Sequence, residues 1–458
     1  MSFAELRRWR IFQTFASRKW IRRIAFWGGA VGVGVLAVAF AILSDQAGRL
    51  QEMIYHRERW AMLAWTPAIT AIAVWVALRF FPGSGGSGIP QVIAAIELDD
   101  PASVARLLPI RAACGKLALT CFGVLGGLSI GREGPTVQIA ATLMAALGRW
   151  VKLPAWAEQR ALIVAGGAAG IAAAFNTPLA GVVFAIEELS RSFESRTSGM
   201  VLTSVILAGI TSLALIGNYS YFGTNPADLG FGAGWLCVLV TGIAGGFAGG
   251  GFSQILLMAT EGKVAAHLAR RPVVAAAAIG LAVGAIGLAC NGTSFGTGYG
   301  TARGLLAAGN HAMPVLSWYF FPAKFTVTIL SYLSGIPGGV FAPSLTAGAA
   351  LGSLLSHLVP GAPPGTVVLL GMAAYFTGVV QAPITSIVIV MEMTNNQQLA
   401  MPLMATSLIA QLTSRAICPH PLYAALAERF KAAPSPESAA EPDMLATEVP
   451  AEGDSAPI

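Results

Sequence analysis

The sequence predicts an all-α polytopic membrane protein composed of two related halves, with short helices that glycine and proline interrupt. Three observations support this fold class: the composition, a series of long apolar blocks, and a motif pattern that occurs twice. Of the 458 residues, 55% are hydrophobic and 11% are charged, and the mean hydropathy is +0.68. Soluble domains carry roughly twice that share of charged residues. We therefore expect most of the chain to lie within a lipid bilayer.

The first element is a basic segment at 1–23, which carries much of the net charge of +6. The positive-inside rule places this segment in the cytoplasm, and membrane orientation explains the charge better than nucleic-acid binding does. The apolar block that follows, 24–44, is too long for the core of a signal peptide. It is expected to remain in the chain as the first span.

Further apolar blocks follow along the chain, and a membrane helix needs about 20 such residues. The clearest blocks are 24–44, 60–81, 201–217, 233–259, 272–290 and 366–380. Shorter apolar pieces, broken by Gly and Pro, lie between them. Irregular backbone is tolerated in the bilayer only where protein or a cavity surrounds it. These interruptions therefore indicate broken helices around an internal site, within a membrane domain that covers 24–430.

The last segment, 431–458, is rich in Pro, Ala, Ser and acidic residues and has no apolar periodicity. It is predicted to be a disordered cytoplasmic tail, too short for a folded regulatory domain. The five cysteines form no CxxC motif and mostly lie in apolar segments. They are predicted to be small core residues, with no disulfide framework or metal site.

A duplicated pattern divides the membrane domain. The stretches NTPLAGVVFAIEEL (176–189) and QAPITSIVIVMEMT (381–394) each have proline at the third position and glutamate nine residues later, Glu187 and Glu392. Upstream of each stretch, at similar distances, stands a G-x-x-x-P element. Two elements in the same order indicate an internal duplication, as in transporters that bind substrate between repeats. The alternative is a pair of similar amphipathic hairpins.

The two halves are expected at approximately 60–217 and 233–425. Whether they run parallel or inverted stays open at this point, because the number of spans between them is uncertain. Three loops share one design: GSGIP (86–90), GREGP (131–135) and GVFAP (339–343). Each places glycine before, and proline at, the expected first turn of a helix. Free N–H groups and the helix dipole would there form an anion site without a bare cation.

Several charged residues lie in apolar surroundings. An ionisable group in the membrane is a functional hypothesis by default. Glu133, at an anion-binding helix start, is expected to act as a gate, whereas Arg132 raises the anion potential and pairs elsewhere, since adjacent helix residues do not face each other. Lys116 is expected to influence the electrostatics of the pathway, with a snorkelling structural lysine as the alternative. Glu392 is expected to brace a helix junction.

Two enzyme-like interpretations of the first loop are also open. Gly83, Gly85 and Gly88 satisfy G-x-G-x-x-G, but no βαβ pattern surrounds them, so a dinucleotide site is not expected. GGSG at 85–88 is similar to the G-x-S-G of rhomboid intramembrane proteases, for which His357 could serve as the base. A single serine with one distant histidine is weak support for a protease.

The three loops together resemble the signatures of the CLC family of chloride channels and chloride/proton antiporters. The resemblance runs from GSGIP through both repeat stretches to PLY at 421–423, over roughly 80–425. It implies a homodimer in which each subunit has its own pathway, built from two inverted halves of short, tilted helices. The anion-binding residues that it implies are Gly86, Ser87, Gly88, Arg132, Gly134, Val340, Phe341 and Tyr423.

The resemblance also separates the glutamates. It implies that Glu133 is the external gate and that Glu188 is the internal proton-transfer residue, although locally Glu187 and Glu188 could be a charged helix end. Serine at position 87 fits chloride or nitrate, and chloride is preferred. The expected function is chloride/proton antiport in the cell (inner) membrane with both termini cytoplasmic, without enzymatic activity, cofactor or nucleic-acid partner. A passive chloride channel of the same family is the alternative.

Overall fold

Helices account for nearly all of the described structure. The computed structural model describes residues 3–98, 100–151, 156–190, 195–217, 221–223, 228–230, 232–307, 318–359 and 361–432. Within these ranges no β-strand forms, and two isolated β-bridges join glycine-rich loops. The predicted all-α fold class is confirmed.

The first half and the second half each supply a series of helices. Those of the first half are α1 (Phe3–Arg57), α2 (Met62–Phe80), α3 (Ile89–Glu97), α4 (Pro101–Leu107), α5 (Ile110–Leu125), α6 (Glu133–Trp150), α7 (Trp156–Phe175), α8 (Pro178–Phe184) and α9 (Ser195–Ile216). Those of the second half are α10 (Leu236–Thr260), α11 (Gly262–Arg270), α12 (Pro272–Ala289), α13 (Tyr299–Ala307), α14 (Phe320–Leu333), α15 (Phe341–Ser356), α16 (Pro364–Val380), α17 (Pro383–Thr394), α18 (Ala400–Ile417) and α19 (Leu422–Lys431). A π-helical segment, Ala185–Ser190, continues α8, and short 3₁₀ turns (Arg59–Ala61 and Ala233–Trp235) precede α2 and α10.

The described part of the chain contains six helices that are long and apolar enough to cross a membrane. Five of them correspond to predicted spans, and the sixth, Pro101–Leu125, which comprises α4 and α5, was not among the predicted blocks. Conversely, the predicted span 366–380 belongs to α16, which has only 17 residues. Every residue of α16 from Gly365 onward is buried. This helix is apolar all round because protein encloses it, chiefly α10, α15 and α18.

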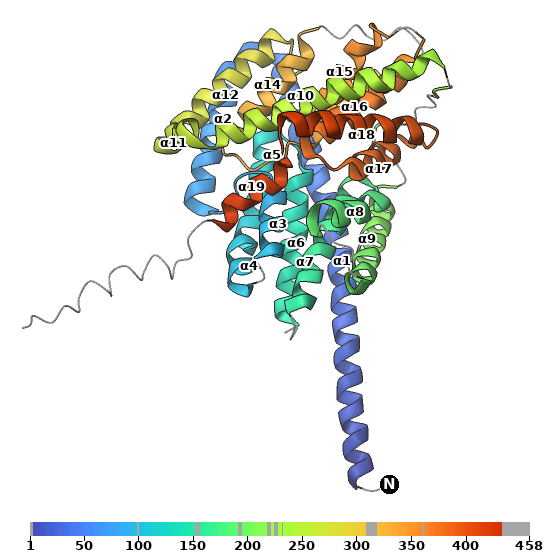
Figure 1. Ribbon diagram of the computed structural model, residues 1–458. Coiled ribbons are helices and arrows are strands. Elements are labelled where there is room, and N and C mark those ends of the chain that lie inside the picture. The colour runs from blue at the N-terminus through green and yellow to red at the C-terminus, as the bar shows by residue number, and fades with distance from the viewer. Residues whose placement is uncertain are drawn as a thin grey trace, which may run out of the picture.

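The helix α1 begins at Phe3 and continues without a break through the first span to Arg57. Figure 1 shows its N-terminal part projecting beyond the other helices. From Phe3 onward, the basic segment is therefore a continuation of the first spanning helix. The predicted tail lies outside the described residues from residue 433 onward.

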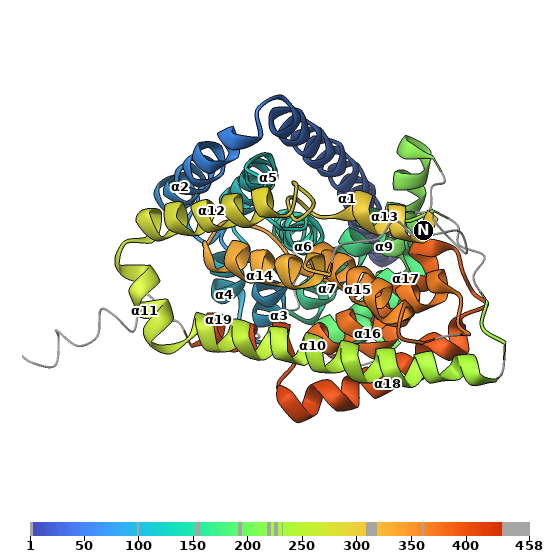
Figure 2. The ribbon, with the colours of Figure 1, turned by 90° about the horizontal axis from the view of Figure 1, so that it is seen from above.

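The last helix, α19, lies beside α3 although more than 300 residues separate them, as Figure 1 and Figure 2 both show. Its final residue, Lys431, donates a hydrogen bond of 2.6 Å to Glu97 of α3 and another of 2.6 Å to Glu428. The hydrogen bond with Glu428 and then that with Glu97 raise the pKa of Lys431. The ion pair helps to hold α19, and hence the PLY motif at its start, against the first half.

Close helix contacts build the centre of each half. Gly166 and Gly170 bring α7 against α6, because a methyl group on either would meet backbone atoms of α6 at 2.7–3.1 Å. Gly348 and Gly352 bring α15 equally close to α16. Small residues allow such close approach between membrane helices, where packing replaces the hydrophobic effect as the driving force. These two helix pairs form the scaffold that carries the glycine-rich loops.

The two repeat stretches contact each other through an exchange of helix caps. Glu187 accepts hydrogen bonds of 3.1 and 2.6 Å from the N–H groups of Ile384 and Thr385, in the first turn of α17. Glu392, nine residues after the equivalent proline, accepts hydrogen bonds of 3.1 and 2.7 Å from the first turn of α8. Each stretch thus caps the other, which requires α8 and α17 to run antiparallel about a pseudo-two-fold axis. The halves are inverted, and the predicted structural role of Glu392 is confirmed.

These caps predict a stability effect. Glu392→Ala should lower the free energy of unfolding by about 1–3 kcal/mol, because two N–H groups at the start of α8 lose a charged acceptor. Thermal unfolding of the detergent-solubilised protein measures this difference. Glu261→Ala is the matched control, since Glu261 precedes α11 without a side-chain capping bond. Equal stability losses in the two variants would contradict the capping role.

Candidate ion-transport site

The three predicted loops meet at the centre of the molecule. Gly131 and Gly339, which hold equivalent places in the two halves, exchange backbone hydrogen bonds of 2.6 and 2.8 Å. The N–H group of Gly338 donates to the carbonyl of Gly86 at 3.2 Å. The starts of α3, α6 and α15 are therefore brought together. Their N–H groups and dipoles all favour negative charge at this place.

The glycines of the first loop shape its backbone. Gly86 and Gly88 have φ angles of 72° and 106°, which side chains rarely allow. The N–H group of Gly88 donates to Gln91 Oε1 at 3.0 Å, and Gln91 Nε2 donates to the Gly85 carbonyl at 2.8 Å. The Gly88 N–H group is thus already used within the loop. Gly88 can therefore contribute to the predicted anion site only by shaping the backbone around Ser87.

Two buried hydroxyl groups lie at this junction. Ser87 and Tyr423 are each 1% exposed. Their hydroxyl groups lie close together, but neither makes a well-formed hydrogen bond within the described part of the chain. Buried polar groups normally have a partner, and leaving one without costs roughly 1–3 kcal/mol. Two hydroxyl donors at the junction of three helix starts are therefore suited to an anion.

Glu133 is fully buried at the first position of α6. Its carboxylate accepts a hydrogen bond from the Tyr299 hydroxyl and lies beside the backbone N–H group of Ala342, at the start of α15. The carboxylate therefore occupies a position that suits an anion. A negatively charged side chain here competes with any free anion for the same N–H groups and dipoles.

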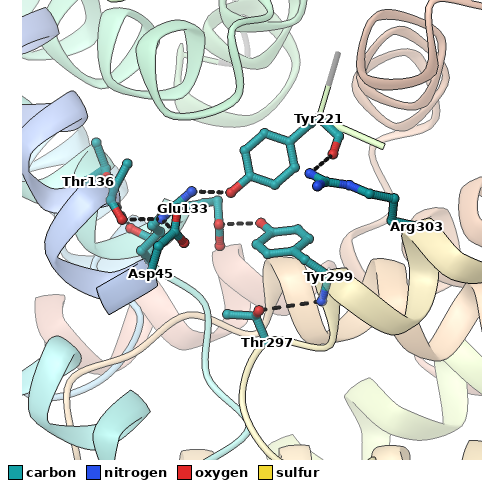
Figure 3. A network of polar contacts seen from close by, with 9 residues as sticks. Asp45, Glu133, Thr136, Tyr221, Thr297, Tyr299 and Arg303 are labelled. Atoms are coloured by element: carbon teal, nitrogen blue, oxygen red, sulfur yellow. Dashed lines mark hydrogen bonds and ion pairs between the residues drawn. The ribbon is translucent and has the colours of Figure 1, made fainter. Parts of the chain in front are cut away.

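Arg132 is buried and turned toward other partners, as predicted. Its guanidinium group donates to the carbonyl of Ala41 at 2.6 Å, to Asp45 at 2.7 Å, and to the Tyr221 hydroxyl. Figure 3 shows this network around Glu133. Both terminal nitrogens of Arg132 are engaged in this way, whereas its buried Nε makes no hydrogen bond in the described structure.

Two tyrosines in this network, Tyr221 and Tyr299, were not predicted from the sequence. The rings of Tyr221 and Tyr299 pack edge to face with centroids 4.6 Å apart, and Arg303 donates to the Tyr221 carbonyl at 2.7 Å (Figure 3). Tyr221 follows α9 and Tyr299 begins α13, so neither belongs to a glycine-proline motif. No spacing in the sequence connects either residue with Glu133, 88 and 166 residues away respectively.

Glu188 is a second buried acid near this junction. It is 3% exposed and lies in the π-helical segment, whereas its neighbour Glu187 points to α17. Both Glu188 and Glu133 are within electrostatic range of Tyr423. Extra residues in a helix turn are frequent at functional sites, because they turn side chains to a new face. The π-helical segment here gives two consecutive glutamates different surroundings.

Lys116 supports the first loop. It is fully buried, and its ammonium group donates to the carbonyls of Gly86 and Gly85 at 2.7 and 3.3 Å. Complete burial rules out the snorkelling alternative. The ammonium group stands next to the Ser87 loop, which agrees with the predicted electrostatic influence on the pathway.

Lys324 is the repeat counterpart of Lys116. It was not predicted from the sequence. Each lysine stands 15 residues before the first glycine of its G-x-x-x-P element. Lys324 is also fully buried, and it donates to the carbonyls of Gly296 and Ser294 at 2.6 and 3.2 Å. The spacing was a signal that could have found it. Two buried lysines thus brace two loops at the centre.

The protease alternative is wrong on geometry. His357 follows the C-terminal end of α15 and is exposed. Ser87 lies among the loops at the N-terminal end of that helix, which is 16 residues and therefore about 24 Å long. A serine and its base must lie within about 3 Å of each other.

The five cysteines are free thiols, of which Cys114 is exposed, in contrast to the predicted core position.

Comparison with known proteins agrees with this geometry. The model of the family described as voltage gated chloride channel matches residues 69–415. The chain belongs to this family. The predicted CLC membership is thereby confirmed, and the chain is grouped with ion transporters and not with proteases.

Relatives in the CLC family include named exchangers. The chain is 33% identical to the H(+)/Cl(-) exchange transporter ClcA of Yersinia pestis bv. Antiqua (strain Angola), over 93% of this chain and 92% of the relative. It is 32% identical to the protein of the same name from Salmonella agona (strain SL483), over 91% of each. These alignments cover both repeat halves.

Solved structures share the fold. A slow cyanobacterial Cl-/H+ antiporter matches with a TM-score of 0.76 and 26% identity, over 90% of this chain and 98% of that one. A CLC-type fluoride/proton antiporter matches with a TM-score of 0.73 and 25% identity, over 88% and 98%. A eukaryotic CLC transporter, 21% identical with a TM-score of 0.70, covers 88% and 74% and shows the fold alone. The chain has the CLC fold of two inverted repeats.

Proposed function

We propose that this protein exchanges chloride for protons across a membrane. The observation that carries this proposal is the position of Glu133, a buried acid whose carboxylate lies where three helix starts favour an anion. An acid in that position couples the two ions, because the proton that neutralises it also removes the competitor of chloride. The names of the relatives, which are exchangers, support antiport over a channel.

The central chloride is held by the Ser87 and Tyr423 hydroxyl groups together with the backbone N–H groups of Val340 and Phe341. The two hydroxyls are buried without a well-formed hydrogen bond in the described structure, and both amides lie at the start of α15. Such a site binds chloride without a bare cation, so the ion can also leave. Gly86, Gly88 and Gly134 shape the backbone around the anion, and Arg132 adds a positive field.

Glu133 is the external gate in this proposal. The ionised carboxylate fills an anion position and closes the pathway to chloride. Once protonated, it loses its attraction to the helix starts and moves away, so that chloride enters in its place. One exchange is complete when the proton is released on one side of the membrane and chloride is released on the other.

Glu188 passes protons on the internal side. It is buried, and both Glu188 and Glu133 lie within electrostatic range of Tyr423, which the proposed chloride site contains. The alternative of a passive chloride channel needs no second buried acid. The burial of Glu188 therefore favours the antiporter.

Reconstitution into liposomes tests the function. A chloride gradient should drive protons uphill, which a pH electrode or an internal dye reports while a chloride electrode follows the anion. Chloride flux without proton movement in the wild type would establish the channel alternative. Replacing chloride with fluoride or nitrate in the same assay tests the preference for chloride.

The setting of the protein is also proposed. The basic residues of segment 1–23 support a cell (inner) membrane location with cytoplasmic termini. A homodimer is implied by the resemblance to the CLC family, and we propose that its contact includes Leu179 and Ile384, which follow the equivalent prolines and are 57% and 56% exposed on the paired helices α8 and α17. Chemical cross-linking in liposomes should give a dimer, and a monomer alone would contradict this assembly.

The packing of Gly134 predicts a loss of chloride binding. A methyl group at Gly134 would collide with the Ser87 hydroxyl and would lie 2.8 Å from the Ser87 carbonyl oxygen. Gly134→Ala should therefore displace Ser87 and weaken chloride binding at least about tenfold, the cost of one charged hydrogen bond. Isothermal titration calorimetry with chloride measures the affinity. Gly251→Ala is the control, because nothing lies within 4 Å of a methyl group there; equal affinities in both variants would contradict the proposed site.

A further inference from the structure

A side chain outside every motif holds the carboxylate of Glu133. Tyr299, the first residue of α13, donates its hydroxyl hydrogen to Glu133 Oε1, as Figure 3 shows. A hydrogen bond to a carboxylate is about twice as strong as a neutral one and is stronger still in a buried site. It stabilises the side chain of Glu133 in the observed position, beside the start of α15.

The loop that carries Tyr299 is itself held in place. Lys324 donates to the carbonyls of Gly296 and Ser294, and the Gly296 N–H group donates to the Gly127 carbonyl at 3.3 Å. Thr346 of α15 donates to the carbonyl of Thr297 at 3.1 Å. The hydroxyl of Tyr299 is therefore aimed by a braced loop, and little conformational freedom is lost when it binds Glu133.

We propose that Tyr299 is a positioning residue that latches the gate, so that it sets how strongly Glu133 competes with chloride. This inference rests on the proposed function, because it takes Glu133 as the gate. The hydroxyl bonds the carboxylate only while the side chain occupies the closed position. The latch therefore stabilises the closed state against both the open state and the state with chloride bound.

The physical consequence is a lower apparent affinity for chloride and slower opening. Chloride must displace the carboxylate, and displacement breaks the Tyr299 hydrogen bond. Removing the hydroxyl in Tyr299→Phe should strengthen apparent chloride binding roughly tenfold, the factor that a hydrogen bond to a charged group supplies. Where gate opening limits turnover, chloride flux rises as well.

The test measures chloride affinity of the full-length protein by isothermal titration calorimetry and chloride flux in liposomes. Tyr55→Phe is the matched control, because its ring packs against Phe295 in the loop that carries Tyr299, but its hydroxyl makes no hydrogen bond with Glu133 or Arg132 in the described structure. We expect less than about a twofold change in that variant. If Tyr299→Phe does not yield folded protein, Tyr299→Leu removes the same hydroxyl.

A second background separates a latch from a purely structural role. In Glu133→Ala the acceptor is absent, so adding Tyr299→Phe should leave chloride affinity unchanged. An equal gain in affinity with and without Glu133, or an unchanged affinity in Tyr299→Phe alone, would overturn the latch. Failure of the proposed function is recognised separately, by absent proton coupling in the wild type.

Discussion

Replacing Glu133 with Gln is expected to abolish proton transport while chloride continues to cross the membrane. Glutamine has nearly the same shape but carries no charge and takes up no proton. It therefore resembles the protonated gate permanently, and chloride is no longer excluded by a carboxylate. Chloride flux should accordingly lose its dependence on external pH, which liposome assays at several pH values measure together with proton uptake.

The outcome that contradicts this role is full proton coupling in Glu133→Gln. Arg132 gives a useful comparison, since its guanidinium group is occupied by Ala41, Asp45 and Tyr221. Arg132→Gln changes the field around the site but leaves the titratable gate in place. Coupling should therefore persist in that variant, at an altered chloride affinity.

Replacing Glu188 with Gln is expected to reduce proton transport at least about tenfold, an effect typical of the loss of a proton-transfer group. Chloride transport should continue, because Ser87, Tyr423 and Glu133 are intact. The chain offers a control in the adjacent residue. Glu187→Gln makes the same chemical change one residue earlier in the chain, where the carboxylate caps α17.

The two glutamates should therefore give opposite phenotypes. Glu187→Gln should keep proton coupling and lower the stability of the folded protein by about 1–2 kcal/mol. Glu188→Gln should lose proton coupling and keep the stability of the folded protein. Proton flux and thermal unfolding of both variants are measured side by side. Coupling lost equally in the two variants would remove the proposed distinction between a cap and a proton-transfer residue.

Local rules were sufficient to predict the loops and the repeat. Glycine and proline have strong backbone preferences of their own, so G-x-x-x-P indicates a helix start wherever it occurs. The same rules could not say that Gly131 and Gly339 would pair with each other. That pairing depends on how the halves are oriented, and the sequence alone left the orientation open.

Five of the six predicted blocks correspond to helices long and apolar enough to cross a membrane, whereas 366–380 forms the 17-residue helix α16, which protein encloses. Composition reports an apolar environment but does not distinguish lipid from protein, since both exclude water. The sequence therefore could not show that α16 is surrounded by other helices. The segment Pro101–Leu125 was not predicted as a span because Lys116 and other polar residues interrupt its apolar pattern. Lys116 donates hydrogen bonds to the Gly85 and Gly86 carbonyls, and only the tertiary structure shows this pairing.

The sequence by itself determined that this is a membrane protein with duplicated glycine-proline loops and an acid, Glu133, in apolar surroundings at a helix start. Those properties follow from composition and from backbone preferences that act over a few residues. Only the tertiary structure decided that Glu187 is a cap, that Lys324 braces the loop that carries Tyr299, and that Tyr299 reaches Glu133. Each of these contacts joins residues 28 to 198 positions apart, and such contacts depend on how helices pack and not on local preference.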